Sequence, residues 1–257
     1  MKSLLVVLLL AGCATPSAAP LPVSTQPEPP APKVAEEAVA QAVPEPPVTG
    51  GWPARMIALA QAEWEFFGRQ TVVIDGEAMS MPNVGAWEDD GPAYSARVNR
   101  YWRAVGRPAL DGDDCREPWS AAFMSWVMQN AGLPAWLFPP SAAHRVYLNH
   151  LLAGRGNAAS VLKPRSIAEY SPKPGDLVCA AGAPAPPFAA GTPLPAMPGG
   201  ALHCDLVVAR DGRSIHAIGG NVRNSVSRTT LTLSPDGYLE ASRRRSWFLI
   251  IENRLDW

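Results

Sequence analysis

The sequence predicts an α+β domain, because helical patterns come first along the chain and short strand patterns follow. Between residues 53 and 152, apolar residues recur at the three- and four-residue spacing of amphipathic helices. After residue 174 the chain changes to short β-branched runs separated by glycine and proline. The 257 residues are 47% hydrophobic and 18% charged, with a formal net charge of -1. This composition suits one globular domain with appendages and excludes the basic surface that nucleic-acid binding requires.

The amino terminus has the pattern of a secretion signal. Lys2 precedes an apolar run at residues 4–10, which is too short to span a bilayer stably, and small residues lead to Cys13. The segment resembles a bacterial lipoprotein signal with its lipobox, which implies that residues 1–13 direct lipidation of Cys13. Ala14 after that cysteine then favours the outer membrane and a periplasmic location. An apolar leader that is cleaved for simple secretion is the alternative.

Residues 14–51 are rich in proline, alanine, valine, glutamate and glutamine. Such a segment buries too little apolar surface to offset the entropy of ordering, so we expect a disordered, proline-stiffened tether. The remainder, residues 52–257, is expected to form a single domain.

Four helices are expected in the first half of that domain. Apolar stripes predict helices at residues 53–67 and 92–105, each followed by glycine. A third helix is expected to begin at Pro118, a first-turn proline, and to end before Gly132. A fourth is expected at residues 141–152, with an apolar side formed by Ala143, Val146, Tyr147, His150 and Leu151.

Ser120 falls in the first turn of the third expected helix. Free backbone N–H groups and the positive end of the helix dipole stabilise an anion there, so a nucleophile gains acidity. The alternative is a serine that only caps the helix or packs as a small residue.

The second half of the domain is expected to form a sheet. A proline-, glycine- and alanine-rich loop at residues 181–200 separates the first two strands, and a loop of that length is usually functional or mobile. The expected strands are residues 176–179, 203–210, 214–218, 222–233 and 247–252.

A hairpin signal fixes the expected register of two of these strands. The Asp-Gly pair at residues 211–212 is typical of a two-residue turn and places Arg210 opposite Arg213. With that register Asn221 lies beside His203.

The other histidines are expected outside this site. The same register places His216 opposite Val207, away from His203. His144 and His150 in the fourth helix are expected to be surface or wedge residues.

Two cysteines are expected to meet in the core. Side-chain alternation places Cys204 on the same face as Leu206, and Cys179 faces the core from the preceding strand. In an oxidising compartment we expect a Cys179–Cys204 disulfide, worth about 3.5 kcal/mol by chain entropy. Two buried free thiols are the alternative.

Several short motifs occur in an order that identifies a resemblance. Trp-Ser-Ala-Ala-Phe at residues 119–123 precedes Gly132, and Gly-Asp-Leu-Val at residues 175–178 precedes His203 and Gly-Gly-Asn-Val at residues 219–222. The pattern resembles the CHAP and NlpC-type branch of the papain-like cysteine peptidases, whose helix opens Trp-Cys-Ala-Ala-Phe. It is more similar to a related bacterial family of domains of unknown function in which the serine form occurs. The resemblance covers about residues 91–257.

The resemblance implies a papain-like fold and a peptidoglycan amidase or endopeptidase without a metal or cofactor. It assigns Ser120 as the nucleophile, His203 as the base and Asn221 as the residue that orients the base. Asp205 shares a strand face with His203 and is a second candidate for that last role, although at two residues along the strand it is expected to lie beside the site. Trp119 and Trp87 are expected in the substrate groove.

The serine departs from the resembling peptidases. A thiol is partly ionised beside a histidine, whereas a hydroxyl must give its proton to the base during attack. Cys115 is a candidate for a displaced nucleophile, but the acidic residues Asp113, Asp114 and Glu117 around it disfavour a thiolate.

Two main hypotheses follow for the function. The chain is either a lipid-anchored, monomeric hydrolase of peptidoglycan amide bonds, or a non-catalytic peptidoglycan-binding or regulatory module on the same fold. A third hypothesis is a structural envelope lipoprotein. The enzyme hypothesis requires the Ser120 hydroxyl to lie within hydrogen-bond reach of His203. The polar segment at residues 71–90 has no predicted structure.

Overall fold

The structure is a computed structural model that describes residues 49–113, 115–182, 194, 196–240 and 244–256. The chain divides into residues 1–44 and 45–257, and every described residue belongs to the second unit. Cys13, the predicted leader and residues 14–48 of the predicted tether lie outside the described residues. Residues 183–193 of the predicted loop also lie outside them.

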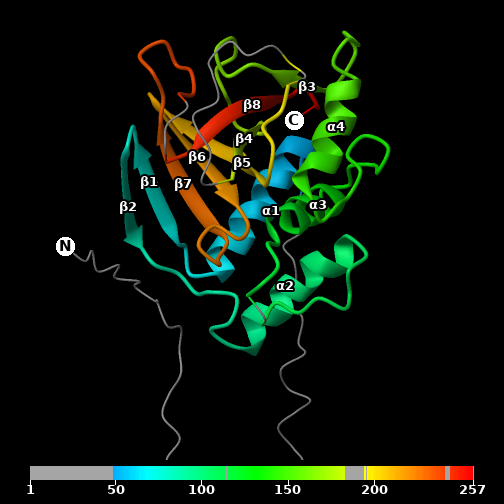
Figure 1. The fold of residues 1–257 in the computed structure, drawn as a ribbon, viewed down its shortest axis with the longest axis vertical. Helices are drawn as coiled ribbons and strands as arrows, with labels where there is room; N and C mark the ends of the chain where they lie inside the picture. The colour runs from blue at the N-terminus through cyan, green and yellow to red at the C-terminus, as the bar shows by residue number, and fades with distance from the viewer. Residues whose placement is uncertain (1–48, 114, 183–193, 195, 241–243, 257) are drawn as a thin grey trace, which may run out of the picture. The chain divides into compact units, whose positions relative to one another are not determined.

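Within the described residues, four helices and one eight-stranded sheet confirm the α+β class (Figure 1). The strand order is β2-β1-β7-β6-β5-β4-β8-β3. Neighbouring strands are antiparallel except β1 and β7, which are parallel. The helices are α1 (Trp52–Phe66), α2 (Pro92–Ala104), α3 (Ser120–Asn130) and α4 (His144–Ala153). The strands are β1 (Thr71–Asp75), β2 (Ala78–Asn83), β3 (Leu162–Arg165), β4 (Leu177–Ala181), β5 (Leu202–Asp211), β6 (Ser214–Gly219), β7 (Ser227–Thr232) and β8 (Ser246–Asn253).

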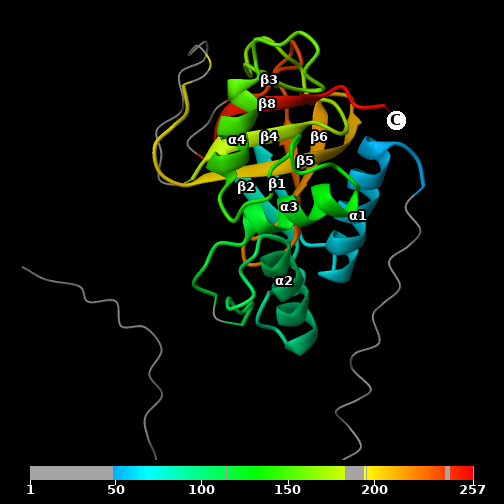
Figure 2. The ribbon, with the colours of Figure 1, turned by 90° about the vertical axis from the view of Figure 1, so that its right-hand side faces the viewer.

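The helices pack on one side of the central strand β5. Helices α1, α3 and α4 each contact β5, and α2 packs on α3; Figure 2 shows α3 and α4 in front of the sheet. Cys204, Leu206 and Val208 of β5 join the apolar cluster beneath the helices, whereas Val207 joins a second cluster formed by the sheet. This alternation is the strand periodicity predicted from the sequence.

Helix α4 begins later than expected because Ser141 is committed to other bonds. The Ser141 backbone N–H donates to the Ser125 hydroxyl at 3.0 Å, and the Ser141 hydroxyl accepts from the Ala143 N–H at 3.1 Å. Ala143 is extended, with φ -130° and ψ 123°. The first helical residue is therefore His144.

Three strands lie where none was predicted. Strands β1 and β2 form a hairpin in the polar segment after α1, and β3 pairs with β8. Every residue of β2 is exposed, so this edge strand has no apolar alternation to detect. The pairing of β1 with β7 joins residues more than 150 positions apart and has no local signal.

The register of the β5–β6 hairpin differs from the prediction. Asp211 pairs with Ser214, so Gly212 and Arg213 form the turn, and Gly212 takes the required positive φ of 54°. A bulge between Val207 and Ala209 then shifts the register by one residue. The predicted pairs Arg210–Arg213 and His216–Val207 are therefore wrong: Arg210 pairs with Ile215 and His216 with Ala209, and the β5–β6 pairs end at Leu206, before His203.

Candidate functional site

Ser120 is the first residue of α3, preceded by Trp119 at the N-cap. The residue is only 6% exposed, and the first nine residues of the helix are buried. Because the N–H groups of a first turn have no partner within the helix, they are available to an oxygen beside Ser120.

Trp119 anchors this helix start within the core and does not line a groove. Its side chain is fully buried, stacks on Tyr101 with ring centroids 5.5 Å apart, and donates its indole N–H to the Glu88 carboxylate. The prediction that Trp119 contacts substrate is therefore wrong. Trp87 is 44% exposed, and its backbone N–H donates to the Asp90 carboxylate at 2.8 Å.

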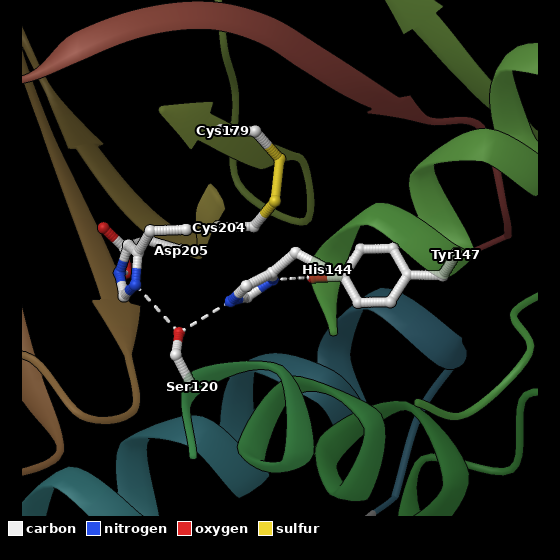
Figure 3. The surroundings of a disulfide bond; sticks show 7 residues. Ser120, His144, Tyr147, Cys179, Cys204 and Asp205 are labelled. Atoms are coloured by element: carbon white, nitrogen blue, oxygen red, sulfur yellow. Dashed lines mark hydrogen bonds and ion pairs between the residues drawn. A yellow bond between two sulfur atoms is a disulfide. The ribbon is translucent and has the colours of Figure 1, made fainter. Parts of the chain in front are cut away.

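The Ser120 hydroxyl lies between two imidazoles that come from different layers of the fold. Its Oγ is 2.8 Å from Nδ1 of His203 on β5 and 2.9 Å from Nε2 of His144 on α4. Figure 3 shows the Ser120 oxygen with a dashed line to each side. One of the two histidines is the predicted base, and the other was not predicted to lie here.

Asp205 holds the ring of His203 from the side opposite Ser120. His203 Nε2 lies 2.5 Å from Asp205 Oδ1. Since a carboxylate only accepts, Nε2 carries the hydrogen, and the Nδ1 of a neutral ring then accepts the hydroxyl hydrogen of Ser120. The three residues form a hydrogen-bonded serine, histidine and carboxylate series.

Asp205 is fully buried and charged. Burial alone would raise the pKa of Asp205, but the charge and hydrogen bond of His203, with the charge of Arg245, hold that pKa below its ordinary value. Among the described residues, its second oxygen, Oδ2, is buried without a hydrogen-bond partner. The carboxylate charge is therefore directed at the imidazole.

Two glycines at the end of β6 allow this assembly. A Cβ on Gly219 would lie 1.7 Å from Asp205 Oδ1, so the carboxylate occupies the place of that side chain. A Cβ on Gly220 would lie 2.5 Å from Phe123 Cβ, so the absence of a side chain lets α3 approach the strand end. Side chains at either position would separate the helix or the carboxylate from the site.

Tyr147 holds the second imidazole. The Tyr147 hydroxyl bonds Nδ1 of His144 one helical turn away, and both residues are buried (Figure 3). Burial, and then the neighbouring His203, hold the pKa of His144 well below its ordinary value despite the charge of Asp205. Burial, and then Asp205, raise the pKa of Tyr147 well above its ordinary value. His144 is thus neutral at pH 7 and Tyr147 keeps its hydrogen.

The prediction that His144 is a surface or wedge residue is wrong, because the buried face of α4 was assigned incorrectly. The expected stripe included Val146, which is 49% exposed, and His150, which is exposed. His144 and Tyr147 share the buried face at a spacing of three. A His-x-x-Tyr pair on an apolar helix face is the signal that would have identified the residue. His216 lies apart, with Nδ1 3.0 Å from the Thr230 hydroxyl.

Asn221 does not orient His203. Both ring nitrogens of His203 are engaged, by Ser120 and by Asp205. Asn221 lies in the turn after β6 with a positive φ of 56°. The secondary candidate Asp205 takes the place that the resemblance gave to Asn221.

Cys115 is exposed and is not activated. Desolvation by the surrounding chain, and then the carboxylates of Glu88 and Asp89, raise the pKa of its thiol to about 12. These are not the acidic neighbours expected from the sequence, but their effect on a thiolate is the expected one.

Cys179 and Cys204 form a disulfide between facing residues of β4 and β5. Both cysteines are fully buried, and Cys204 separates His203 from Asp205 in the sequence. The bond therefore fixes the part of β5 that carries the base.

A cavity of about 360 Å³ opens next to the start of α3. Its wall includes Pro118 and Ala143, which are close neighbours of Ser120 and His144 in the sequence. Trp102 and Leu110 supply apolar surface, and the exposed Arg107 supplies charge. This is the described cavity that lies nearest to Ser120 along the chain, and it offers room for part of a peptide.

Two negative findings concern the part of the chain that the structure describes. None of its helices is long and apolar enough to cross a membrane. It contains no group of three or more His, Cys, Asp or Glu side chains arranged to hold a metal ion.

Comparison with known proteins identifies a family and no individual relative. Residues 88–257 match the family described as an uncharacterized protein conserved in bacteria (DUF2272). No curated protein and no solved structure matches the chain.

Proposed function

The chain belongs to this family of uncharacterized bacterial proteins, and we propose that it is a serine hydrolase that cleaves amide bonds of peptidoglycan. The observation that carries the proposal is the series formed by Ser120, His203 and Asp205. Its Oγ–Nδ1 distance of 2.8 Å and Nε2–Oδ1 distance of 2.5 Å satisfy the reach required of a nucleophile, a base and the group that orients it.

The reaction needs only proton transfers that this series can make. Ser120 Oγ attacks the carbonyl carbon while its proton passes to His203 Nδ1, and the Asp205 carboxylate stabilises the resulting imidazolium. The C–N bond then breaks, and the amine leaves with that proton. Water attacks the acyl-enzyme and gives a proton to His203, which returns it to Ser120 as the acid is released. First-turn N–H groups of α3, which begins at Ser120, can donate to the intermediate oxyanion.

The peptide substrate class rests on the motif resemblance and on the order of the elements. The proposed nucleophile opens a helix and the proposed base follows on a long strand, as in the papain-like CHAP and NlpC-type fold. We therefore assign the chain to that fold as part of the proposal. The cavity beside Pro118 has the size to accept stem-peptide residues.

The proposed location is the periplasmic face of the outer membrane, with a lipid on Cys13. A buried disulfide next to the base is consistent with an oxidising compartment. Mass spectrometry of the protein from membrane fractions should detect a lipid-modified Cys13, and a Cys13→Ala variant should leave that fraction. Unchanged fractionation of the variant would contradict the anchor.

Hydrolysis is tested with purified peptidoglycan and the full chain. Wild type should release muropeptides with new amino groups, and both Ser120→Ala and His203→Ala should abolish the release. Asn221→Gly is the matched control, because glycine accepts the positive φ and Asn221 lies outside the series.

A non-catalytic peptidoglycan-binding module is the second candidate, favoured by the 6% exposure of Ser120. A serine this buried and hydrogen-bonded on both sides can be purely structural. Binding of peptidoglycan without product release, or turnover only in Ser120→Cys, would support this candidate and refute the serine hydrolase.

A further inference from the structure

Ser120 has one more imidazole neighbour than a serine, histidine and carboxylate series requires. His144 Nε2 lies 2.9 Å from Ser120 Oγ, on the side opposite His203. His144 is 5% exposed, and its other ring nitrogen bonds the hydroxyl of the fully buried Tyr147. A buried polar pair at this position requires each hydrogen to have a defined place.

The hydrogen positions follow from the fixed acceptor at one end of the network. The Asp205 carboxylate accepts from His203 Nε2–H, so His203 Nδ1 accepts from the Ser120 O–H. Ser120 Oγ then has only lone pairs to offer, and His144 must present its Nε2–H to them. The Nδ1 of a neutral His144 is consequently an acceptor, and Tyr147 donates its O–H to it. All four hydrogen bonds run in one direction, from Tyr147 to Asp205.

We propose that His144 is a further catalytic residue of this site, a neutral N–H donor that stabilises the negative charge developing on Ser120 Oγ as its proton leaves. Tyr147 is the positioning residue, whose O–H donates to Nδ1 of His144 and so supports the Nε2–H tautomer that Ser120 requires. This inference rests on the proposed function and assigns a group to the nucleophile itself.

This donor compensates for a chemical difference between a serine and a cysteine nucleophile, which is the stage at which each becomes charged. A thiol beside a histidine ionises before it attacks, whereas the serine oxygen gains its charge only in the transition state. During attack one lone pair of Oγ forms the bond to carbon, while Oγ keeps hydrogen bonds from His203 and His144. No proton leaves His144, and no bond to it forms or breaks. A neutral donor of this kind changes the rate of chemistry by about 10²–10³-fold.

The burial of His144 supports a role as a hydrogen-bond donor and argues against a role as a second base. The groups that face its ring are Ser120 of α3, His203 and Asp205 of β5, and Tyr147 of its own helix. With its pKa held well below the ordinary value, the ring of His144 stays neutral at pH 7. A second cation is thus kept out of a site that must form an imidazolium at His203.

The test uses a fluorophosphonate, which needs no knowledge of the natural substrate. Ser120 Oγ forms the P–O bond, fluoride leaves, and the hydroxyl proton passes to His203 Nδ1. The labelling rate of the full chain is measured by intact mass for wild type, His144→Ala, His144→Gln, Tyr147→Phe and the control His150→Ala. His150 is the exposed histidine of the same helix.

We expect His144→Ala to label about 10²–10³-fold more slowly than wild type. His144→Gln should recover at least about tenfold of that loss, because its amide N–H can reach the same oxygen. His150→Ala should label at the wild-type rate. A His144→Ala variant that folds and labels like wild type would overturn the proposal while leaving the serine hydrolase intact.

A second readout concerns the tautomer and does not depend on turnover. In wild type labelled with ¹⁵N-histidine, the His144 ring should show a protonated Nε2 and an unprotonated Nδ1 between pH 6 and pH 8. Tyr147→Phe should keep this tautomer, because Ser120 Oγ still offers only lone pairs, and should shift the Nδ1 resonance, because that nitrogen loses its donor. A protonated Nδ1 in wild type would overturn the donor role even where labelling is normal. A wild type that is never labelled would overturn both this role and the proposed function.

Discussion

The two imidazoles beside Ser120 are held by chemically opposite partners. His203, on the sheet, gives its far N–H to a buried carboxylate, whereas His144, on α4, receives a hydrogen from a buried phenol. A carboxylate favours the cationic ring, and a phenol beside a buried ring leaves it neutral. The same side chain therefore becomes a proton acceptor on one side of the serine and a fixed donor on the other.

The two sides also differ in how they are fastened. His203 and Asp205 lie on a central strand that is tied to β4 by the Cys179–Cys204 disulfide. His144 opens α4, and the neighbouring Arg145 holds the Pro198 carbonyl at 2.6 Å. The following predictions test this contrast, from the largest expected effect to the smallest.

The largest effect is expected from the nucleophile and the base. Ser120→Ala or His203→Ala should lower peptidoglycan hydrolysis by about 10⁴-fold or more, because the attack then lacks its oxygen or its proton acceptor. Product release is followed by mass spectrometry. If His203→Ala lowered the hydrolysis rate no more than His144→Ala does, the two histidines would not have the separate roles of proton acceptor and hydrogen-bond donor.

Asp205→Asn should lower hydrolysis by about 10³-fold while the protein stays folded. The amide does not stabilise the imidazolium, and its N–H can donate to Nε2 and so leave the hydrogen on Nδ1, where Ser120 needs an acceptor. Hydrolysis rates are compared with those of Tyr147→Phe, for which we expect a loss of about tenfold or less. Equal losses would mean that the carboxylate has no special place.

Loss of the disulfide should lower the free energy of unfolding by about 3.5 kcal/mol, since it closes a loop between residues 25 apart. The double variant Cys179→Ala/Cys204→Ala is compared with wild type by urea unfolding, with Cys115→Ser in both proteins to remove the exposed thiol of Cys115. An unchanged unfolding midpoint would show that the Cys179–Cys204 disulfide does not stabilise the strands that carry His203 and Asp205.

Gly219→Ala should reduce hydrolysis by about 10²-fold, because the added methyl group occupies the place of the Asp205 carboxylate. Gly156→Ala is the matched control, since its Cβ would meet nothing within 4 Å. If the two variants were equally active, the carboxylate could move without consequence.

Protonation of His144 and protonation of Asp205 should lower the stability of the protein in two different pH ranges. The folded-state pKa of His144 is lowered from 6.5, so the unfolded chain binds the proton first, and stability falls as the pH drops below about 6.5. The lowered pKa of Asp205 acts only below about 3.8. Between these values wild type should lose up to about 1.4 kcal/mol per pH unit more than His144→Gln. Parallel stability curves in chemical denaturation would contradict a buried neutral His144.

Local patterns in the sequence were sufficient to predict the helix position of Ser120 and the shared strand face of His203 and Asp205. The proline at 118 and the apolar stripe after it placed Ser120 at a helix start, and strand alternation placed His203 and Asp205 together. The cysteines predicted to pair lie opposite each other on β4 and β5. The family comparison agrees with the expected bacterial family of unknown function, and the CHAP and NlpC likeness remains a proposal.

The remaining site residues depended on geometry that no short segment contains. The buried face of α4 was predicted one residue, or about 100°, out of phase. Val146 was therefore expected to be buried and His144 was not, whereas the structure has the reverse. The choice of turn at Gly212 and the bulge near Val207 changed the register of β5 and β6 from the predicted one. Strands β1 and β2 escaped prediction because one pairs over a long sequence separation and the other is wholly exposed.

The space beside Gly219 also gives a criterion for sorting members of this family. A sequence that keeps the serine, the histidine and the aspartate but carries any larger residue at this position has no room for the carboxylate as it lies here. Under the proposed function, such a member would retain the three named residues and still hydrolyse more slowly, because its histidine would lack the carboxylate that orients it. Under the proposed function, hydrolysis by a member of this family would therefore depend partly on a glycine of the neighbouring strand, which a search restricted to reactive side chains would not examine.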